Sequence, residues 1–447
     1  MQIVPHVTDA VQDWIERVAR VPVEQGYMGG DATPEVCLVE VGGTVGDIES
    51  AVFLEALRQF QFRVGIENFA LLHVSLVPVL GSVGEQKTKP TQHTVKELRS
   101  LGLSPTLLVC RSETQLSRET KQKLALFCHV LPDHVIGVHN VPNIYHVPLM
   151  LARQRVSELL CSHLKLSPPY PSPLLDRWRE IARRVDEPSE PGVRIALVGK
   201  YTVLQDSYLS VARSFNHSGI CCNRRVEIEW IESSLLEPLA GDAREDARAV
   251  AADAWARLRS AHGVLVPGGF GQRGFEGKVL AIKHCRENKV PFLGVCLGYQ
   301  AAAVEIARDV LGLQDATSEE FNRQAAHRVV VYMPEFHTGD MGGTMRLGAR
   351  VTTLFPYPDG RTSLAQDVYG GVAAVSERHR HRYEVNPALV RDFEEKAGFF
   401  FTGRDADGRG DRMEIAELDR EKHPFFWCCQ YRASSGRARC ARGFRGN

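Results

Sequence analysis

Cys296 lies in a sequence context that is typical of a catalytic nucleophile. An apolar run beginning at Val290 ends in Gly294-Val-Cys296-Leu-Gly298, and a good helix-forming run follows it. This is G-x-C-x-G at a strand-to-helix turn, the cysteine form of the nucleophile elbow. The two glycines permit a tight turn that lifts one side chain into a cleft, and the positive end of the helix favours a thiolate. The alternative is a buried structural cysteine in front of a helix.

A glycine-dense loop upstream supports the catalytic interpretation. The segment Val264-Leu-Val-Pro-Gly268-Gly269-Phe-Gly271-Gln-Arg-Gly274 follows the end of another predicted strand. Backbone N–H groups in such a loop can bind an oxyanion beside a thiolate. A loop of this kind, placed one strand and one helix before a cysteine elbow, resembles the class I glutamine amidotransferases. In that family the cysteine attacks the side-chain amide of glutamine and releases ammonia.

Two motifs in the N-terminal half have residue types that suit phosphate binding. Glu40 comes near the end of a predicted strand over residues 35–41, and a glycine loop follows, so the carboxylate is well placed for a magnesium ion near phosphates. The loop is not a Walker A motif, because it lacks the Lys-Ser/Thr pair. The segment Lys87-Thr-Lys89-Pro-Thr-Gln92 also follows an apolar strand and could hold a polyphosphate. The alternatives are a solvated acid in a tight turn and a solvated pair of lysines.

The composition is that of an ordinary soluble protein. The 447 residues predict two or three domains, and 54 basic against 54 acidic residues give no bulk attraction to nucleic acid or anionic lipid. No apolar run is long enough to span a membrane, and the N-terminus has no signal-peptide pattern. The 11 cysteines are scattered without metal-type CxxC pairs, which favours a reducing cytoplasm over a disulfide framework.

Proline-rich and polar stretches divide the chain between residues 166 and 191. Both halves alternate apolar strands with helical segments, which predicts an α/β protein with two domains and largely parallel sheets. We place the domains at residues 1–165 and 192–447, joined by a linker over 166–191 that contains one short helical segment with Trp178. Residues 244–261 are rich in alanine and arginine, and we interpret them as a solvated amphipathic helix.

Six motifs, in this order, resemble the CTP synthase family. They are GGTVGDIES, KTKPTQH, PGGFGQRG, GVCLGYQ, GGTMRLG and ERHRHRYEVN, and the resemblance covers nearly all of residues 2–431. It implies an N-terminally truncated amidoligase (synthetase) domain of the P-loop type, followed by a class I glutamine amidotransferase domain with a flavodoxin-like fold.

The resemblance also implies a reaction and its partners. In the family, ATP phosphorylates the 4-oxygen of UTP, and ammonia from glutamine displaces that phosphate to give CTP. The implied small molecules are UTP, ATP with Mg²⁺, glutamine, and CTP as an inhibitor. A cytoplasmic homotetramer is the family's form, with no nucleic acid or membrane as partner.

The resemblance assigns roles to individual positions. Cys296 matches the nucleophile, Glu40 the magnesium-binding glutamate, and Val141 a backbone position near the ATP adenine. Glutamine is held in the family by positions that match Gly269, Leu297, Gln300, Glu320 and Arg382. Positions used by UTP and CTP match Asp47, Ile48, Glu49, Lys87, Thr88, Lys89, Pro90, Thr91, Gln92 and Lys123.

Three polar segments have simpler interpretations. Residues 378–382, Arg-His-Arg-His-Arg, could be a solvated basic edge in which Arg382 alone contacts glutamine. We interpret residues 342–348 as a turn before a strand. Residues 405–411 fail as a calcium loop, because Arg409 and Ala416 stand where oxygen ligands are needed, so we expect a hairpin turn there.

The chain departs from the family at both ends. The P-loop and a second metal-binding acid precede, in the family, the segment that resembles Gln2–His6. At the other end, Tyr431 is not followed by the family's His-Pro-Glu, whose histidine is the base for the cysteine. Residues 432–447 contain no histidine or acid, and their arginine-rich composition suggests a shifted reading frame, an RNA-binding tail being the alternative.

These departures predict that the chain as given is impaired or inactive as a CTP synthase. We also expect its first domain to expose apolar side chains of the sheet. One alternative is a catalytically silent nucleotide-binding subunit that co-assembles with a full-length enzyme. Another is a stand-alone glutamine amidotransferase, against which the KTKPTQ and GGTVGDIES motifs argue.

Overall fold

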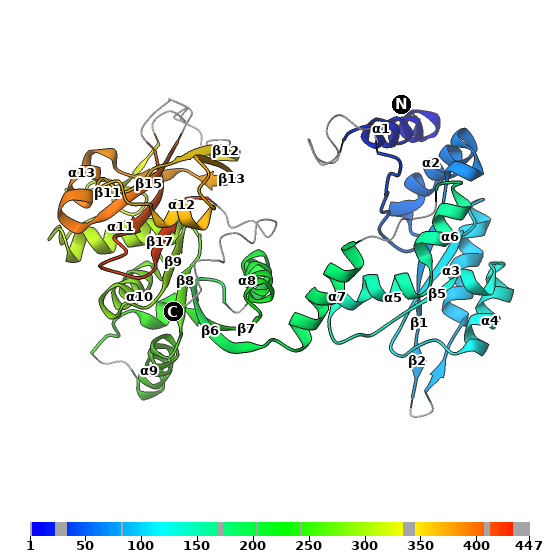
Figure 1. The fold of residues 1–447 in the computed structure, drawn as a ribbon, viewed down its shortest axis with the longest axis horizontal. Helices are drawn as coiled ribbons and strands as arrows, with labels where there is room; N and C mark the ends of the chain where they lie inside the picture. Colours follow the sequence, from blue (N-terminus) through cyan, green and yellow to red (C-terminus); the bar gives the residue numbers. More distant parts are fainter. Residues whose placement is uncertain are drawn as a thin grey trace. The chain divides into compact units, whose positions relative to one another are not determined.

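The computed structural model describes residues 2–22, 34–81, 84–167, 173–202, 204–241, 244–333, 345–405 and 412–431. The chain forms two compact units, Met1–Asp186 and Glu187–Asn447 (Figure 1). Within the described residues, no helix has the length and apolar character that crossing a membrane requires.

Unit 1 is built on a three-stranded parallel sheet in the order β1-β4-β5. Its strands are β1 (Leu72–Val77), β2 (Val79–Leu80), β3 (Glu85–Gln86), β4 (Leu107–Ser112) and β5 (Val135–His139), of which β2 and β3 form a separate hairpin. Its helices are α1 (Thr8–Ala19), α2 (Ile48–Val64), α3 (Lys89–Ser100), α4 (Arg118–Cys128), α5 (Val147–Arg153), α6 (Val156–His163) and α7 (Pro173–Asp186). Short single-turn helices lie at Ile3–Val7, Ile66–Asn68, Pro132–His134 and Ile144–His146.

Apolar side chains cover both faces of the β4 and β5 strands. Val95 and Leu124 from α3 and α4 pack with Leu108 on one face, and α5 and α6 pack against Ile136 on the other. The outer strand β1 is less protected, because three of its apolar residues are exposed: Leu72, Val74 and Leu76. Exposed apolar side chains on this sheet are what the sequence predicted.

The predicted strand over residues 35–41 is wrong. Residues 36–43 have no regular structure and no ladder partner among the described residues, and Leu38 and Val39 are exposed. A run of β-branched residues becomes a strand only where a neighbouring strand accepts its backbone hydrogen bonds. Glu40 therefore lies on an extended loop segment rather than at a strand end.

Helix α7 belongs to unit 1 instead of standing free between the units. Trp178 stacks on Tyr145 with ring centroids 6.1 Å apart, and Asp186 accepts from Asn143 Nδ2 at 2.6 Å. His146 Nε2 also lies 2.6 Å from the Asp186 carboxylate. The linker boundaries at 166–191 stay a prediction, but these contacts fix its helical part against the preceding single-turn helix.

Unit 2 contains a nine-stranded sheet in the order β13-β12-β15-β16-β17-β9-β8-β6-β7. Its strands are β6 (Glu190–Gly199), β7 (Arg224–Glu232), β8 (Gly263–Val266), β9 (Phe292–Val295), β12 (Arg346–Leu354), β13 (Ala374–His381), β15 (Phe399–Asp405), β16 (Met413–Leu418) and β17 (Phe426–Cys429). A second, small sheet holds β10 (Thr317–Ser318), β11 (Arg328–Tyr332) and β14 (Tyr383–Val385).

The large sheet has a parallel half and an antiparallel half. Strands β7, β6, β8, β9 and β17 pair in parallel, as the sequence predicted, whereas β16, β15, β12 and β13 extend the sheet through antiparallel pairs. The helices are α8 (Leu209–Cys222), α9 (Glu245–Arg259), α10 (Phe275–Asn288), α11 (Leu297–Asp309), α12 (Leu364–Val368) and α13 (Val390–Asp392). Single-turn helices lie at Gln205–Tyr208, Ser233–Leu236, Pro387–Leu389 and Phe393–Ala397. Helix α9 confirms the helix predicted over 244–261.

Helix α11 is the centre of the unit 2 core. All of its residues from Leu297 to Ala307 are buried, and its alanines pack with Val264 and Phe292 of the parallel strands. Small side chains allow a helix to approach a sheet closely, and the sheet in turn fixes where the helix begins. The residue before this helix is Cys296.

Candidate active site

The turn that carries Cys296 has the strained geometry of a nucleophile elbow. Cys296 adopts φ 52° and ψ −105°, a conformation that residues with a side chain rarely occupy. A Cβ on Gly298 would lie 2.0 Å from the Val266 carbonyl oxygen, and one on Gly294 would lie 3.0 Å from the Gly298 carbonyl carbon. Only glycine fits at Gly298, and a side chain at Gly294 would be tightly crowded, so the strand-to-helix elbow predicted from the sequence is confirmed.

Hydrogen bonds hold this turn in place from both sides. The Cys296 N–H donates to the Cys429 carbonyl at 2.7 Å, which ties the elbow to the end of β17. The Gln300 N–H donates to the Cys296 carbonyl at 3.0 Å and closes the first turn of α11. Because the backbone is fixed, the partly exposed Cys296 side chain has a defined direction.

The glycine-dense loop lies directly beside the elbow. A Cβ on Gly268 would stand 3.3 Å from Cys296 Cβ and 3.8 Å from its Sγ, and one on Gly269 would stand 3.5 Å from Leu297 Cδ2. The Gly271 N–H donates to Glu320 Oε1 at 2.9 Å. Gly269, Leu297 and Glu320, which come from three separate segments, are therefore brought together around Cys296.

The two remaining residues predicted to hold glutamine meet at β14. Gln300 Nε2 donates to the Tyr383 carbonyl at 2.9 Å, and Gln430 Nε2 donates to the same oxygen at 2.8 Å. Arg382 immediately precedes Tyr383, and its side chain is half-buried. The structure thus places Gln300 and Arg382 on adjoining segments at the start of α11.

The charge state of Cys296 differs from the sequence-based expectation. Burial raises the pKa of the Cys296 thiol to about 11, and the Glu320 carboxylate acts in the same direction. The Leu297 backbone N–H and the Lys278 ammonium lower the pKa, but by less. The prediction of a thiolate was therefore wrong for the unliganded site, in which the sulfur keeps its proton at neutral pH.

Two buried lysines beside the loop were missed in the sequence. Lys200 Nζ donates to the Phe270 carbonyl at 2.8 Å and also contacts the Gly271 carbonyl. Lys278 Nζ donates to the Pro267 carbonyl at 3.4 Å. Lysine is almost never fully buried without a role. A lysine followed by Val279-Leu-Ala-Ile282 on a predicted helix was the available signal for Lys278.

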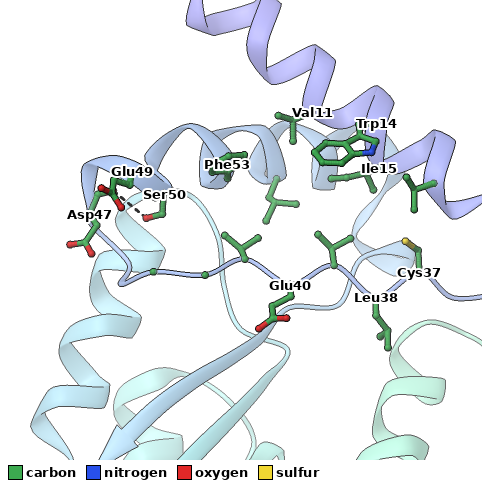
Figure 2. A pocket seen from close by; sticks show the side chains of 16 residues that line it. Val11, Trp14, Ile15, Cys37, Leu38, Glu40, Asp47, Glu49, Ser50 and Phe53 are labelled. Carbon is green, nitrogen blue, oxygen red and sulfur yellow. Dashed lines mark hydrogen bonds between the residues drawn. The ribbon is translucent and has the colours of Figure 1, made fainter. Parts of the chain in front are cut away.

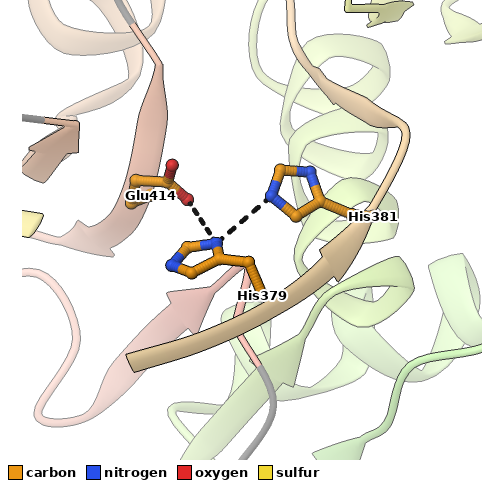
Figure 3. A group of neighbouring side chains, drawn as sticks. All are labelled: His379, His381 and Glu414. Carbon is orange, nitrogen blue, oxygen red and sulfur yellow. Dashed lines mark hydrogen bonds and ion pairs between the residues drawn. The ribbon is translucent and has the colours of Figure 1, made fainter. Parts of the chain in front are cut away.

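Strand β13 alternates buried histidines with exposed arginines, so the solvated basic edge is confirmed only for Arg378 and Arg380. His379 Nδ1 lies 3.2 Å from His381 Nε2 and 3.3 Å from Glu414 Oε2 of β16 (Figure 3). His381 Nδ1 lies 3.3 Å from the Tyr383 carbonyl, an acceptor, which assigns the proton to that nitrogen. The other ring nitrogen of His381 then accepts from His379.

This histidine pair is neutral and is neither a base nor a favourable metal site. Burial lowers the pKa of His379 to about 2 and that of His381 to about 3, and nearby arginines contribute. The three ligand atoms lie within 4.8 Å of one another, which suits a metal ion in geometry. Positive charge nevertheless surrounds them, because Arg346, Arg350 and Arg412 all oppose a further cation.

In unit 1, a cavity of about 600 Å³ lies between α1, residues 37–43 and α2. Three predicted site residues line it, and Figure 2 shows Asp47 and Glu49 together at the start of α2, with Glu40 apart on the extended segment. Carboxylate oxygens are the ligands that Mg²⁺ prefers, so Glu40 is of a suitable type, but among the described residues it does not form a ligand cluster with Asp47 and Glu49. Ile48, between the two acids, is exposed.

The KTKPTQ residues form a separate group at the start of α3 and do not line that cavity. Lys87 pairs with Glu85 at 2.6 Å, and Lys89 Nζ lies 5.9 Å from the centre of the Phe127 ring. Thr88 and Thr91 are buried, and Pro90 occupies the first turn of the helix.

The threonine and glutamine side chains of this group contact protein atoms. The Thr91 hydroxyl accepts from Ser75 Oγ at 2.9 Å and donates to the Leu76 carbonyl at 3.2 Å, so it already holds α3 to β1. Gln92 Nε2 donates to the Thr88 hydroxyl at 3.1 Å. Lys123 is exposed on α4, and Val141 is half-buried just after β5.

Three sequence-based interpretations fall outside the described residues. They concern residues 342–344 of the GGTMRLG turn, the hairpin turn over 406–411, and the tail over 432–447. The strands that flank residues 406–411, β15 and β16, do pair antiparallel.

Comparisons with known proteins agree with both units. Residues 1–166 match the family model described as CTP synthase N-terminus, and residues 203–431 match glutamine amidotransferase class-I. The CTP synthase of Eremothecium gossypii is 52% identical over 442 residues, which cover 96% of this chain and 74% of that protein. CTP synthase 1 of Homo sapiens is 51% identical over 432 residues, covering 96% of this chain and 70% of that protein.

Among solved structures, the glutaminase domain of Trypanosoma brucei CTPS with bound acivicin is 37% identical, with a TM-score of 0.47, and covers 54% of this chain and 85% of that one. The two family matches and the identity of about half over nearly the whole sequence decide the assignment. The chain belongs to the CTP synthase family, the ligases that hydrolyse glutamine to supply ammonia.

Proposed function

We propose that Cys296 is the nucleophile that releases ammonia from glutamine for the ATP-dependent conversion of UTP to CTP. The observation that carries this proposal is the elbow itself, a cysteine at positive φ between Gly294 and Gly298, the second of which tolerates no side chain. A strained backbone of this kind persists where it aims a reactive group. The glycine loop beside it supplies backbone donors for an oxyanion.

The cysteine step proceeds through a thioester. The Cys296 sulfur bonds to the side-chain carbonyl carbon of glutamine, whose oxygen becomes an oxyanion within reach of the Leu297 and Gly269 N–H groups. The C–N bond then breaks, and the nitrogen takes up the thiol proton and leaves as ammonia. Water cleaves the thioester to give glutamate and the free thiol.

Charged residues around the elbow suit the ends of glutamine. Glu320 complements the α-amino group and keeps one carboxylate oxygen for it, since the other accepts from Gly271. Arg382 complements the α-carboxylate through paired N–H donors. Gln300 holds the intervening segment through its bond to the Tyr383 carbonyl.

Unit 1 is proposed to bind the nucleotides. Lys87 and Lys89 bind the phosphates of UTP or of inhibitory CTP, with Lys123 nearby on α4, and Val141 lies near the ATP adenine. Glu40 would hold Mg²⁺, which neutralises phosphate charge during phosphoryl transfer. Asp47, Ile48 and Glu49 face the pyrimidine, and the assembled form is a homotetramer in the cytoplasm.

We further infer that the 447-residue polypeptide hydrolyses glutamine slowly. Its thiol is protonated at neutral pH, and residues 432–447 offer no histidine or acid to remove the proton. His379 and His381 are poor substitutes, because their pKa values lie at about 2 and about 3. Deleting the base of such a system lowers the rate by roughly 10⁴ to 10⁶.

Ammonia release from glutamine tests this half of the proposal. Replacing residues 432–447 with a His-Pro-Glu continuation should raise the rate by several orders of magnitude, and adding Cys296→Ala should abolish the gain. No gain would mean that the base is misassigned. A gain that survives Cys296→Ala would remove Cys296 from the mechanism.

Calorimetric titration with UTP tests the nucleotide half. Lys87→Met and Lys89→Met should each weaken binding about tenfold or more, because a lysine–phosphate contact is charge-assisted. Lys96→Met is the matched control, since Lys96 is exposed on the same helix as Lys89. Equal affinities for the three variants would refute the assignment, and binding without glutamine hydrolysis in the extended chain would favour the silent nucleotide-binding subunit.

A further inference from the structure

Lys278 is a cation buried beneath the loop that borders Cys296. Its side chain is 0% exposed, and it lies on the face of α10 that also carries Ala281 and Ile282. Its Nζ is 3.4 Å from the Pro267 carbonyl oxygen and 3.8 Å from the position that a Cβ on Gly269 would occupy. The ammonium therefore lies against both peptides that flank Gly268, whose own neighbour is Cys296.

Packing does not explain a charge at this position. Removing an ammonium from water is unfavourable unless strong partners compensate. Among the described residues, Lys278 has one hydrogen-bond acceptor, at the long distance of 3.4 Å. An apolar side chain of similar length would pack against Ala281 and Ile282 without that penalty, so the amine requires another reason.

The charged groups that face Lys278 define its surroundings. Its pKa is lowered to about 7, mainly by burial and also by Lys200 and Arg273, while Cys296 and Glu232 act in the opposite direction. Cys296 in turn faces Lys278 and Glu320. Lys278 is the cation that lowers the pKa of Cys296, and Lys200 contacts the same loop.

We propose that Lys278 is a positioning residue of the glutaminase site, whose buried ammonium holds the Pro267–Gly268 peptide and stabilises negative charge on the Cys296 sulfur and on the oxyanion formed from glutamine. This inference rests on the proposed role of Cys296. Lys278 transfers no proton in the reaction, because the thiol proton leaves with ammonia. Its effect is electrostatic, and it acts through the loop and the cysteine without touching substrate.

The two titrations are coupled in a defined direction. A Cys296 thiolate raises the pKa of Lys278, and the Lys278 ammonium lowers the pKa of Cys296, so ammonium and thiolate favour each other. Removing the ammonium removes an influence that lowers the Cys296 pKa. The thiolate fraction at pH 7 must then fall, by tenfold for each unit by which the pKa rises.

Alkylation of Cys296 by iodoacetamide, followed by peptide mass spectrometry between pH 6 and 9, tests the proposal in the full chain. Lys278→Met should slow alkylation by about tenfold at pH 6, and this difference should shrink as the pH rises through 7 and Lys278 loses its proton. Lys200→Met is the matched control, because Lys200 is also buried and also binds the loop carbonyls. It should show no such pH-dependent slowing.

Urea unfolding separates the electrostatic role from a structural one. Replacing a buried charge by an apolar side chain of similar shape should leave Lys278→Met at least as stable as the parent chain. An unchanged alkylation rate in Lys278→Met, or an equal pH-dependent slowing in Lys200→Met, would overturn the inference, as would a less stable Lys278→Met chain whose alkylation is slowed equally at every pH. Failure of iodoacetamide to modify Cys296 in the parent chain would instead contradict the proposed function.

Discussion

Gly298→Ala tests whether the elbow depends on direct contact between two backbones. The added Cβ would lie 2.0 Å from the Val266 carbonyl oxygen and 2.8 Å from its carbonyl carbon, and real Cβ atoms keep at least 3.0 Å. Neither obstacle is a flexible side chain. Either β8 or the start of α11 must therefore move by about 1 Å, the difference between these two distances.

The displacement predicts two separate losses. Overpacking of a rigid core costs about 1–3 kcal/mol of unfolding free energy. Misplacing a reacting group by about 1 Å costs roughly 10²-fold in rate. The loss of unfolding free energy outweighs the gain of at most about 1 kcal/mol that alanine offers over glycine inside a helix.

Gly241→Ala is the control for this substitution. It makes the same chemical change in the same unit, at a position where a Cβ would meet nothing within 4 Å. The assays are urea unfolding and the rate of Cys296 modification by a glutamine analogue carrying a chloroketone. If Gly298→Ala matched Gly241→Ala in both assays, the backbone contact would not define the site.

Three further predictions concern buried charge. Arg346→Met should lose about 3–5 kcal/mol of unfolding free energy, because it leaves the buried Glu414 without its arginine partner, although Asp405 keeps Arg412. Arg361→Met, at a partly exposed ion pair, should change little in the same urea titration. Burial raises the pKa of Glu417 from 4.5 to about 7, so between these pH values the folded state binds a proton that the unfolded state has lost. As the pH rises through this window, the unfolding free energy of the parent chain should fall by about 3 kcal/mol relative to that of Glu417→Gln. If the difference in unfolding free energy between the two chains stayed constant from pH 4.5 to 7, the prediction would be contradicted. Burial lowers the pKa of His381 from 6.5 to about 3, so its contribution to the unfolding free energy is complete above pH 6.5 and falls by about 1.4 kcal/mol per pH unit below it. His381→Gln should remove this pH dependence of the unfolding free energy. An unchanged pH dependence would show that the ring is protonated in the fold.

The parts of the fold that sequence predicted best are those with a local signal. The cysteine elbow, the helix over residues 244–261 and the parallel strands before the loop over residues 268–274 and before Cys296 all have patterns that short-range chemistry determines. The strand predicted at residues 35–41 failed, because strand formation depends on a partner elsewhere in the fold. The antiparallel half of the large sheet was missed for the same reason.

The candidate site was predicted in its residues but not in its electrostatics. Gly269, Leu297 and Glu320 do come together around Cys296, through contacts that no spacing rule reveals. The helix end alone suggested a thiolate, while burial, which only the packed structure reveals, raises the thiol pKa to about 11. Lys278 was overlooked because a single lysine in a helical sequence normally faces solvent.

The location of the reactive cysteine tests the central claim most directly. The chain should be treated with the chloroketone analogue of glutamine, digested, and each cysteine peptide quantified by mass spectrometry with and without excess glutamine. Cys296 should be modified first and be protected by glutamine, whereas the exposed Cys37 and Cys221 should react slowly and without protection. Modification that favours Cys37 or Cys221, or that glutamine does not reduce at Cys296, would contradict the account.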